Sequence, residues 1–247
     1  MSGHSKWANI KFRKERQDAK KGKIFTKLIK EITIAARSGG SDESTNPRLR
    51  TAIQNAKAAN MPTKNIENAI MKGTGELPGV VYEEVAYEGY GPAGVAMYIE
   101  CTTDNKNRTV SEIRHLLSKY GGNLGESGCV AWMFDKKGLI KVSKQNYNEE
   151  ELMLLAIDSG AEDFKIEDDY FEIYTNYEDL DAVNSRLNEN RIQIENADIT
   201  FIPQSTIQLD EKSADQMLKL MEALDENDDV QDVYANFDID EEIMEKM

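Results

Sequence analysis

LIKVSKQNYNEEELMLLAIDSGAEDFKIEDDYFEIYTNYEDLDAVNSRLNENRIQIENADITFI, residues 139–202, is the stretch that decides the fold of this chain. Runs rich in β-branched and aromatic residues predict strands at 139–142, 163–167, 170–174 and 192–202. Apolar residues at helical spacing predict helices at 149–159 and 180–190. The resulting order, β-α-β-β-α-β, is typical of a ferredoxin-like unit.

The flanking sequence predicts the same order once more. Before the stretch, strands at 95–102 and 129–134 surround a helix at 108–119; after it, strands at 205–209 and 230–237 surround a helix at 214–224. We therefore predict that one ferredoxin-like unit is inserted into the β–β connection of another, with hinges at Lys136-Lys137-Gly138 and Pro203. The alternative is a single, larger α+β domain.

The N-terminal part predicts helices only. A long amphipathic helix is expected over residues 14–37, and Gly39-Gly40 is a typical helix end. Asn46-Pro47 is a typical start of a second helix, with Asn as N-cap and Pro at the first position. A third helix is expected from Pro62 to Gly73, followed by a turn-rich connection over residues 73–79.

The predicted fold class is therefore α+β, with an N-terminal three-helix domain and two ferredoxin-like α/β lobes, one inserted into the other. The predicted domains are a basic helical domain over residues 1–78, a discontinuous α/β domain over 79–135 plus 204–240, and an inserted α/β domain over 136–203. Residues 241–247 are expected to form an acidic tail, either solvated or folded into a short terminal helix.

Charge divides the chain into two unequal parts. Residues 1–72 hold 16 Lys+Arg against 6 Asp+Glu, a net charge of +10; the remainder holds 14 against 39, a net of −25, and the two sum to −15. A basic end on an acidic body predicts that this end meets a polyanion.

The basic residues gather near the N-terminus, with two aromatic side chains among them. Cations neutralise phosphates, and aromatic faces stack on unpaired bases. The alternative is a solvated helix face whose aromatic residues pack in a core. We expect nucleic-acid contact from Lys6, Trp7, Lys11, Phe12, Arg13, Lys14, Arg16, Lys20, Lys21, Lys23 and Lys27.

Composition excludes several other classes of protein. No apolar run is long enough to span a membrane, and the N-terminus has no secretory-signal core, so no membrane partner is expected. Two cysteines, Cys101 and Cys129, cannot form a disulfide framework, which favours a reducing cytoplasm.

Catalytic and metal-binding patterns are lacking, so we expect a non-enzymatic protein with no cofactor, metal or small-molecule substrate. The two histidines and two cysteines show no zinc-ligand spacing. The glycine-rich run at 121–128 follows a helix and precedes a predicted strand, the reverse of a nucleotide fingerprint. Cys129 and His115 are the candidates for a nucleophile pair, but a buried structural thiol is the better interpretation of Cys129. Asp225, Asn227 and Asp229 resemble the start of a calcium loop but lack its later ligands, so a polar turn is predicted.

Long segments resemble the YebC/PmpR family. They are MSGHSKWANIKFRKERQDAKKGKIFTKLIKEITIAARSGG at 1–40, NPRLRTAIQNAKAANMPTKNIENAIMKGTG at 46–75, and YEGYGPAGVAMYIECTTDNKNRTVSEIRHLLSKYGGNLGESGCVAWMFDKKG at 87–138. The resemblance implies a helical head with two α/β domains and no enzymatic activity. Phe12 stands where a histidine is expected in the family motif. Mitochondrial members carry an N-terminal extension not seen here, which implies a bacterial cytosolic protein.

The resemblance implies two possible functions. The first, which we favour, is a transcriptional regulator that binds duplex DNA; the second is a translation factor that binds ribosomal RNA and eases elongation through proline-rich stretches.

Overall fold

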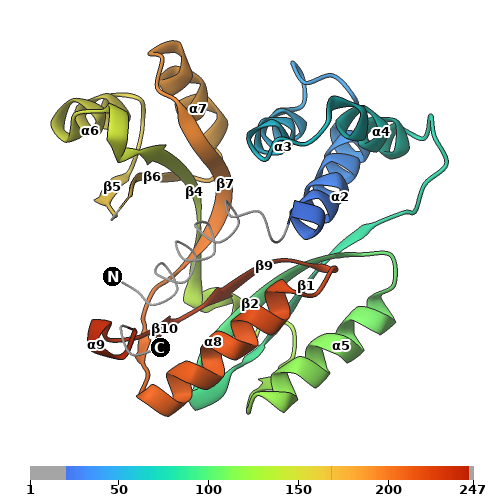
Figure 1. Ribbon diagram of the computed structural model, residues 1–247, viewed down its shortest axis with the longest axis vertical. Coiled ribbons are helices and arrows are strands. Elements are labelled where there is room, and N and C mark those ends of the chain that lie inside the picture. The colour runs from blue at the N-terminus through green and yellow to red at the C-terminus, as the bar shows by residue number, and fades with distance from the viewer. Residues whose placement is uncertain (1–20, 168, 245–247) are drawn as a thin grey trace.

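The computed structural model describes residues 21–167 and 169–244, and its elements form three groups (Figure 1). A cluster of helices from the N-terminal part lies beside two four-stranded sheets. The predicted α+β class is thereby confirmed. Within the described residues, no helix combines the length and apolar character needed to cross a membrane.

Three helices form what we call the helical head. They are α2 (Lys21–Gly39), α3 (Pro47–Ala58) and α4 (Thr63–Thr74). The Asn46 side chain accepts a hydrogen bond from the backbone N–H of Leu49, so it caps α3 as predicted. Ile32, Leu49 and Ile53 are buried in the core that the three helices share.

Helices α2 and α4 pack closely at a glycine. The third helix was expected to end at Gly73, but it continues to Thr74 and Gly75 forms its left-handed C-cap. A Cβ on Gly73 would lie less than 3.0 Å from the Thr33 carbonyl oxygen and from Ala36 Cβ. Gly73 is therefore a packing residue rather than a helix terminator.

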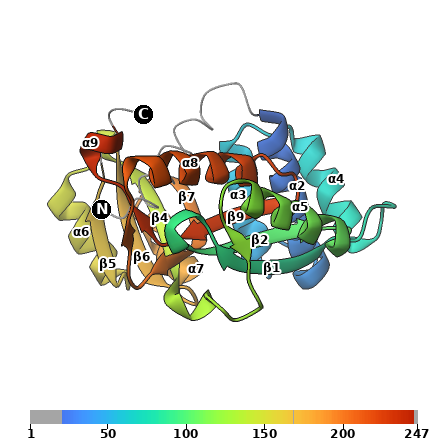
Figure 2. The same ribbon diagram turned by 90° about the horizontal axis from the view of Figure 1, so that it is seen from below.

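The second group is the middle sheet, with strand order β3-β1-β2-β9. Its strands are β1 (Glu83–Tyr90), β2 (Ala96–Thr103), β3 (Asn123–Leu124) and β9 (Val230–Ala235). Helices α5 (Lys106–Lys119) and α8 (Glu211–Asp225) lie side by side on one face and share its core (Figure 2). Short 3-10 helices occur at Pro92–Gly94, Ala131–Met133 and Lys144–Asn146.

The third group is the inserted sheet, which has the predicted β-α-β-β-α-β order. Its elements are β4 (Phe134–Ser143), α6 (Glu149–Asp158), β5 (Asp163–Ile166), β6 (Tyr170–Asn176), α7 (Leu180–Glu189) and β7 (Ile194–Pro203). The strands are antiparallel in the order β5-β6-β4-β7. Residues 136–138, expected as a hinge, lie inside β4 and pair with β7. The domain boundaries given above stay a prediction.

The middle sheet is built from a different set of strands than predicted. The strand expected at 205–209 is instead β8 (Ile207–Gln208), which pairs in parallel with β10 (Phe237–Asp238) outside the sheet. Its expected place is taken by β1, a strand that the sequence pattern did not predict, which pairs antiparallel with β2 and β3. A short helix, α9 (Glu241–Met244), follows β10.

The strand predicted at 129–134 is also wrong. The Glu88 carboxylate accepts hydrogen bonds from the backbone N–H groups of Gly128 at 2.6 Å, Val130 at 2.8 Å and Ala131 at 2.7 Å. These amides point at one buried side chain and cannot serve a strand ladder. The segment forms a turn and a 3-10 helix, and the edge strand is β3.

We predict that Gly73→Ala destabilises the chain by about 1–3 kcal/mol, because the added methyl group forces α2 and α4 apart. The matched control is Gly22→Ala, since a Cβ there meets nothing within 4 Å in the same helical context. That change should be neutral or stabilise by up to about 1 kcal/mol. Urea unfolding of both variants checks the prediction, and equal free energies of unfolding would contradict it.

Candidate nucleic-acid interface

Most of the predicted nucleic-acid-binding residues lie outside the described part of the chain. They are Lys6, Trp7, Lys11, Phe12, Arg13, Lys14, Arg16 and Lys20; Lys21 is described as the first residue of α2 but its side chain is not. The remaining two, Lys23 and Lys27, lie on α2 with described side chains.

Lys23 and Lys27 contact the acidic body of the protein. Lys23 Nζ donates to the Glu226 carbonyl oxygen at 3.0 Å. Lys27 Nζ forms an ion pair with Asp225 Oδ1 at 2.8 Å. The contacts reach the last residue of α8 and the residue that follows it, so these two lysines join the head to the middle sheet's helix α8. Their expected role in binding nucleic acid stays a prediction.

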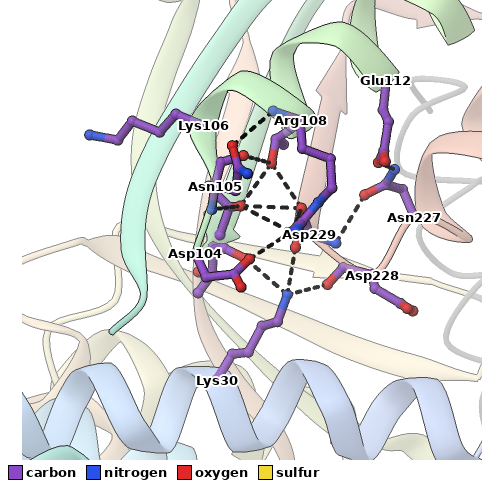
Figure 3. A network of polar contacts seen from close by, with 12 residues as sticks. Lys30, Asp104, Asn105, Lys106, Arg108, Glu112, Asn227, Asp228 and Asp229 are labelled. Atoms are coloured by element: carbon purple, nitrogen blue, oxygen red, sulfur yellow. Dashed lines mark hydrogen bonds and ion pairs between the residues drawn. The ribbon is translucent and has the colours of Figure 1, made fainter. Parts of the chain in front are cut away.

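Lys30 makes the most buried contact of the three lysines on this face of α2 (Figure 3). It follows Lys23 and Lys27 at helical spacing, and only 5% of its surface is exposed. Its ammonium group donates to the Thr102 carbonyl oxygen at 3.0 Å, the Asp228 carbonyl oxygen at 2.6 Å and Asp229 Oδ1 at 2.9 Å. All three N–H donors are thereby satisfied by the middle sheet and its turn.

Asp229 is the acceptor around which this contact is built. Its second oxygen accepts from Arg108 at 2.7 Å, Thr109 at 2.8 Å and Thr103 at 3.2 Å. Burial alone would raise its pKa, but the hydrogen bonds from Arg108, Lys30 and Thr109 outweigh burial and hold the pKa at about 2. We call the ion pair of Lys30 and Asp229 the buried latch; Arg108, whose side chain is exposed, supports it from α5.

Helix α3 carries a second set of contacts. Arg48 forms ion pairs with Glu31 of α2 and Glu84 of β1. Arg50 reaches the inserted sheet, where its Nη1 lies 2.8 Å from Asp181 Oδ1 of α7. These groups are more exposed than the latch, so each contact contributes less to stability.

Three lysines of the described head keep their charge free for other partners. Lys57 of α3 and Lys64 and Lys72 of α4 are exposed. Within residues 21–167 and 169–244, no hydrogen bond or ion pair joins them to the protein. Among the head lysines whose side chains the structure describes, they are the ones that remain available to a polyanion, and the sequence pattern did not single them out.

The candidate nucleophiles show the properties of structural groups. Burial raises the pKa of the Cys101 thiol to about 12. Burial and the nearby Glu88 carboxylate raise the pKa of Cys129 as well, so neither thiol is activated. His115 of α5 lines a shallow cleft against α8, and within the described residues no hydrogen bond links it to Cys129. The parts of the chain that the structure describes hold no cluster of three metal-ligating side chains.

The glycine-rich run at 121–128 is held in place by the protein. Besides the Gly128 amide that donates to the Glu88 carboxylate, the Gly125 N–H donates to the Glu88 carbonyl oxygen at 2.8 Å. Burial would raise the pKa of Glu88, but the bonds from three backbone N–H groups outweigh burial and lower it. The run is therefore anchored to β1 rather than arranged around a phosphate.

The sequence pattern did not predict the buried latch, although it did predict the turn that contains Asp229. The segment 225–229 was predicted to be a polar turn between a helix and a strand, and this is what forms between α8 and β9. Its contact with Lys30 joins residues 199 positions apart. The only signal in the sequence was a lysine among the apolar residues of a predicted amphipathic helix.

We predict that Lys30→Met destabilises the chain by about 3 kcal/mol, because it leaves a buried carboxylate with one fewer cation. Lys64→Met is the matched control at an exposed position and should change stability by less than about 0.5 kcal/mol. Thermal and urea unfolding compare the two. Equal destabilisation by both changes would show that Lys30 is not a structural cation.

We also predict that the latch is sensitive to acid. The folded-state pKa of Asp229 lies below its ordinary value of 3.8, so its ionised form stabilises the fold above about pH 4 and this contribution disappears as the pH falls toward 2. In Asp229→Asn this pH-dependent part should be absent. Unfolding free energies measured from pH 7 to pH 2 test it, and parallel curves for both proteins would contradict it.

Comparison with known proteins identifies the family. Residues 5–76 match the TACO1/YebC protein N-terminal domain, and residues 82–237 match the TACO1/YebC second and third domain. A probable transcriptional regulatory protein of Desulforapulum autotrophicum is 57% identical over 247 residues, covering 100% of both chains. One from Thermotoga maritima is 56% identical, covering 100% of this chain and 98% of its own. The crystal structure of a conserved hypothetical protein from Aquifex aeolicus superposes with a TM-score of 0.87 at 54% identity, covering 92% of this chain and 94% of that one. The chain therefore belongs to the TACO1/YebC family.

Proposed function

We propose that this protein is a non-enzymatic regulator of gene expression that binds nucleic acid through its N-terminal part, and that its target is duplex DNA. The observation that carries the proposal is the division of charge, +10 over residues 1–72 against −25 over the rest. Relatives that match over the full length are named probable transcriptional regulatory proteins, which supports the same function.

The contacts of the head divide its lysines with described side chains into two classes. Lys23, Lys27 and Lys30 satisfy acceptors of the acidic body and so fix the head to it. Lys57, Lys64 and Lys72 are exposed and make no such contact within the described residues. We assign the phosphate contacts to these three lysines together with the basic residues predicted between Lys6 and Lys20.

The acidic body limits how nucleic acid can approach. Its net charge of −25 repels phosphate from the two sheets, so binding is confined to the basic end. The buried latch fixes the helical head on the middle sheet.

The raised thiol pKa values support the non-enzymatic part of the proposal. A nucleophilic cysteine needs a lowered pKa, whereas burial raises the pKa of both Cys101 and Cys129. The proposal would be overturned by a turnover that disappears in Cys129→Ser while the protein stays folded.

Binding should depend on salt and on the N-terminal charges. We predict that Lys11→Glu/Arg13→Glu/Lys14→Glu abolishes binding to duplex DNA, and that Lys57→Glu/Lys64→Glu/Lys72→Glu weakens it. Removing one phosphate-binding cation should reduce the slope of log K against log[salt] by about 1. The matched control is Lys119→Glu/Lys212→Glu/Lys219→Glu, which changes the net charge equally on exposed lysines of the middle sheet's helices. Fluorescence anisotropy at several salt concentrations measures the DNA affinity of all three variants. If the control weakens binding equally, the loss of affinity is due to the net charge of the protein and not to these positions.

The target itself is tested by competition. Labelled protein is bound to purified ribosomes at fixed, near-physiological salt and titrated with mixed-sequence duplex DNA. In the reverse experiment, the protein is bound to the DNA and titrated with ribosomes. We expect DNA to displace the protein from ribosomes. If ribosomes retain it against a large excess of DNA, the target is ribosomal RNA and the protein acts in translation.

A further inference from the structure

Helix α6 is apolar on two opposite sides. Leu152 and Ala156 are buried in the core of the inserted sheet. On the outside, Met153 is 36% exposed, Leu154 61% and Ile157 54%. A surface helix normally carries polar residues there, so this face differs from what stability alone requires.

The three exposed side chains form one patch. Met153 and Ile157 are four residues apart on the helix and Leu154 and Ile157 are three apart, so all three are neighbours on its surface. Figure 1 shows α6 at the outer edge of the molecule, on the side away from the helical head. Contiguous exposed apolar residues with a polar border are typical of protein interaction sites.

The border of this patch is acidic. Helix α6 contains no Lys or Arg, and Glu149, Glu150 and Glu151 form its first turn. Glu150 precedes Leu154 by one turn and Asp158 follows it by one turn. Residues 136–203 hold 7 Lys+Arg against 16 Asp+Glu, a net charge of −9. The surroundings therefore add to the negative potential of the patch.

This charge decides between possible occupants. Nucleic acid and anionic membranes are repelled by the carboxylates. A second copy docking through the same face about a twofold axis would bring the acidic residues of the two copies, Glu150 and Asp158, against one another. A basic protein segment is attracted instead, and an apolar stripe on it would cover the exposed side chains.

We infer that the outer face of α6 binds a basic amphipathic protein segment. The segment is a helix whose apolar side packs on Met153, Leu154 and Ile157, and whose flanking Lys or Arg side chains meet Glu150 and Asp158. Helix α6 lies on the opposite side of the molecule from the helical head (Figure 1), and the inference does not depend on the proposed nucleic-acid interface.

The test uses the full chain and a labelled 18-residue helical peptide with Leu at i, i+3, i+4 and i+7 and Lys at the remaining positions. Anisotropy titrations compare the wild-type chain with Leu154→Ser/Ile157→Ser. The matched control is Val80→Ser/Val81→Ser, because these two valines are 51% and 68% exposed outside the patch. We expect the α6 variant to bind at least about tenfold more weakly and the control to bind as wild type. Thermal unfolding confirms that both variants are folded.

Two further arms separate the charge from the apolar contribution. Glu150→Gln/Asp158→Asn should weaken binding several-fold, and a peptide with Glu in place of Lys should not bind. Equal binding by the two peptides, or equal weakening in the α6 variant and the valine control, would overturn the inference. So would a wild-type dimer in sedimentation that dissociates in Leu154→Ser/Ile157→Ser, since the occupant would then be a second copy.

Discussion

The Lys30 side chain extends from the helical head to the middle sheet, where its ammonium group donates hydrogen bonds to the Asp229 carboxylate and to two backbone carbonyl oxygens. The position of the head depends on this contact, because the other contacts between the head and the sheets are more exposed. A buried ammonium group is tolerated only where each of its donors has an acceptor. One position of α2 satisfies all three donors of Lys30, so the contact selects an orientation.

The latch also organises the middle sheet itself. Asp229 lies in the turn between α8 and β9, and its carboxylate accepts from Arg108 and Thr109 of α5 as well as from Lys30. One side chain thus connects the head, a helix and a sheet edge. Since a buried ion pair adds little net stability over an apolar contact, we regard its role as fixing geometry. The acid sensitivity of the interface follows from the same carboxylate.

Charge links this geometry to function. The cations of α2 that face the body are satisfied internally, whereas Lys57, Lys64 and Lys72 of α3 and α4 are not within the described residues. The negative body directs polyanions to the basic end and, through the acidic border of α6, attracts basic proteins to the opposite side. A regulator with this arrangement brings a nucleic acid and a basic partner to two separate surfaces of one molecule.

The sequence by itself determined the α+β class, the order of elements in the inserted sheet, the N-cap at Asn46 and the division of charge, because these depend on local patterns of a few residues. Tertiary structure decided the features that depend on contacts between residues far apart in the sequence. Glu88 collects the amides of residues 128–131 and so prevents the predicted strand, while β1 takes the place expected for residues 205–209. Lys30 is one basic residue among many in the sequence, and only the approach of Asp229 from 199 positions away makes it a buried structural cation. The free energy of a buried charge depends on the acceptors around it, and those acceptors are brought together only by the fold.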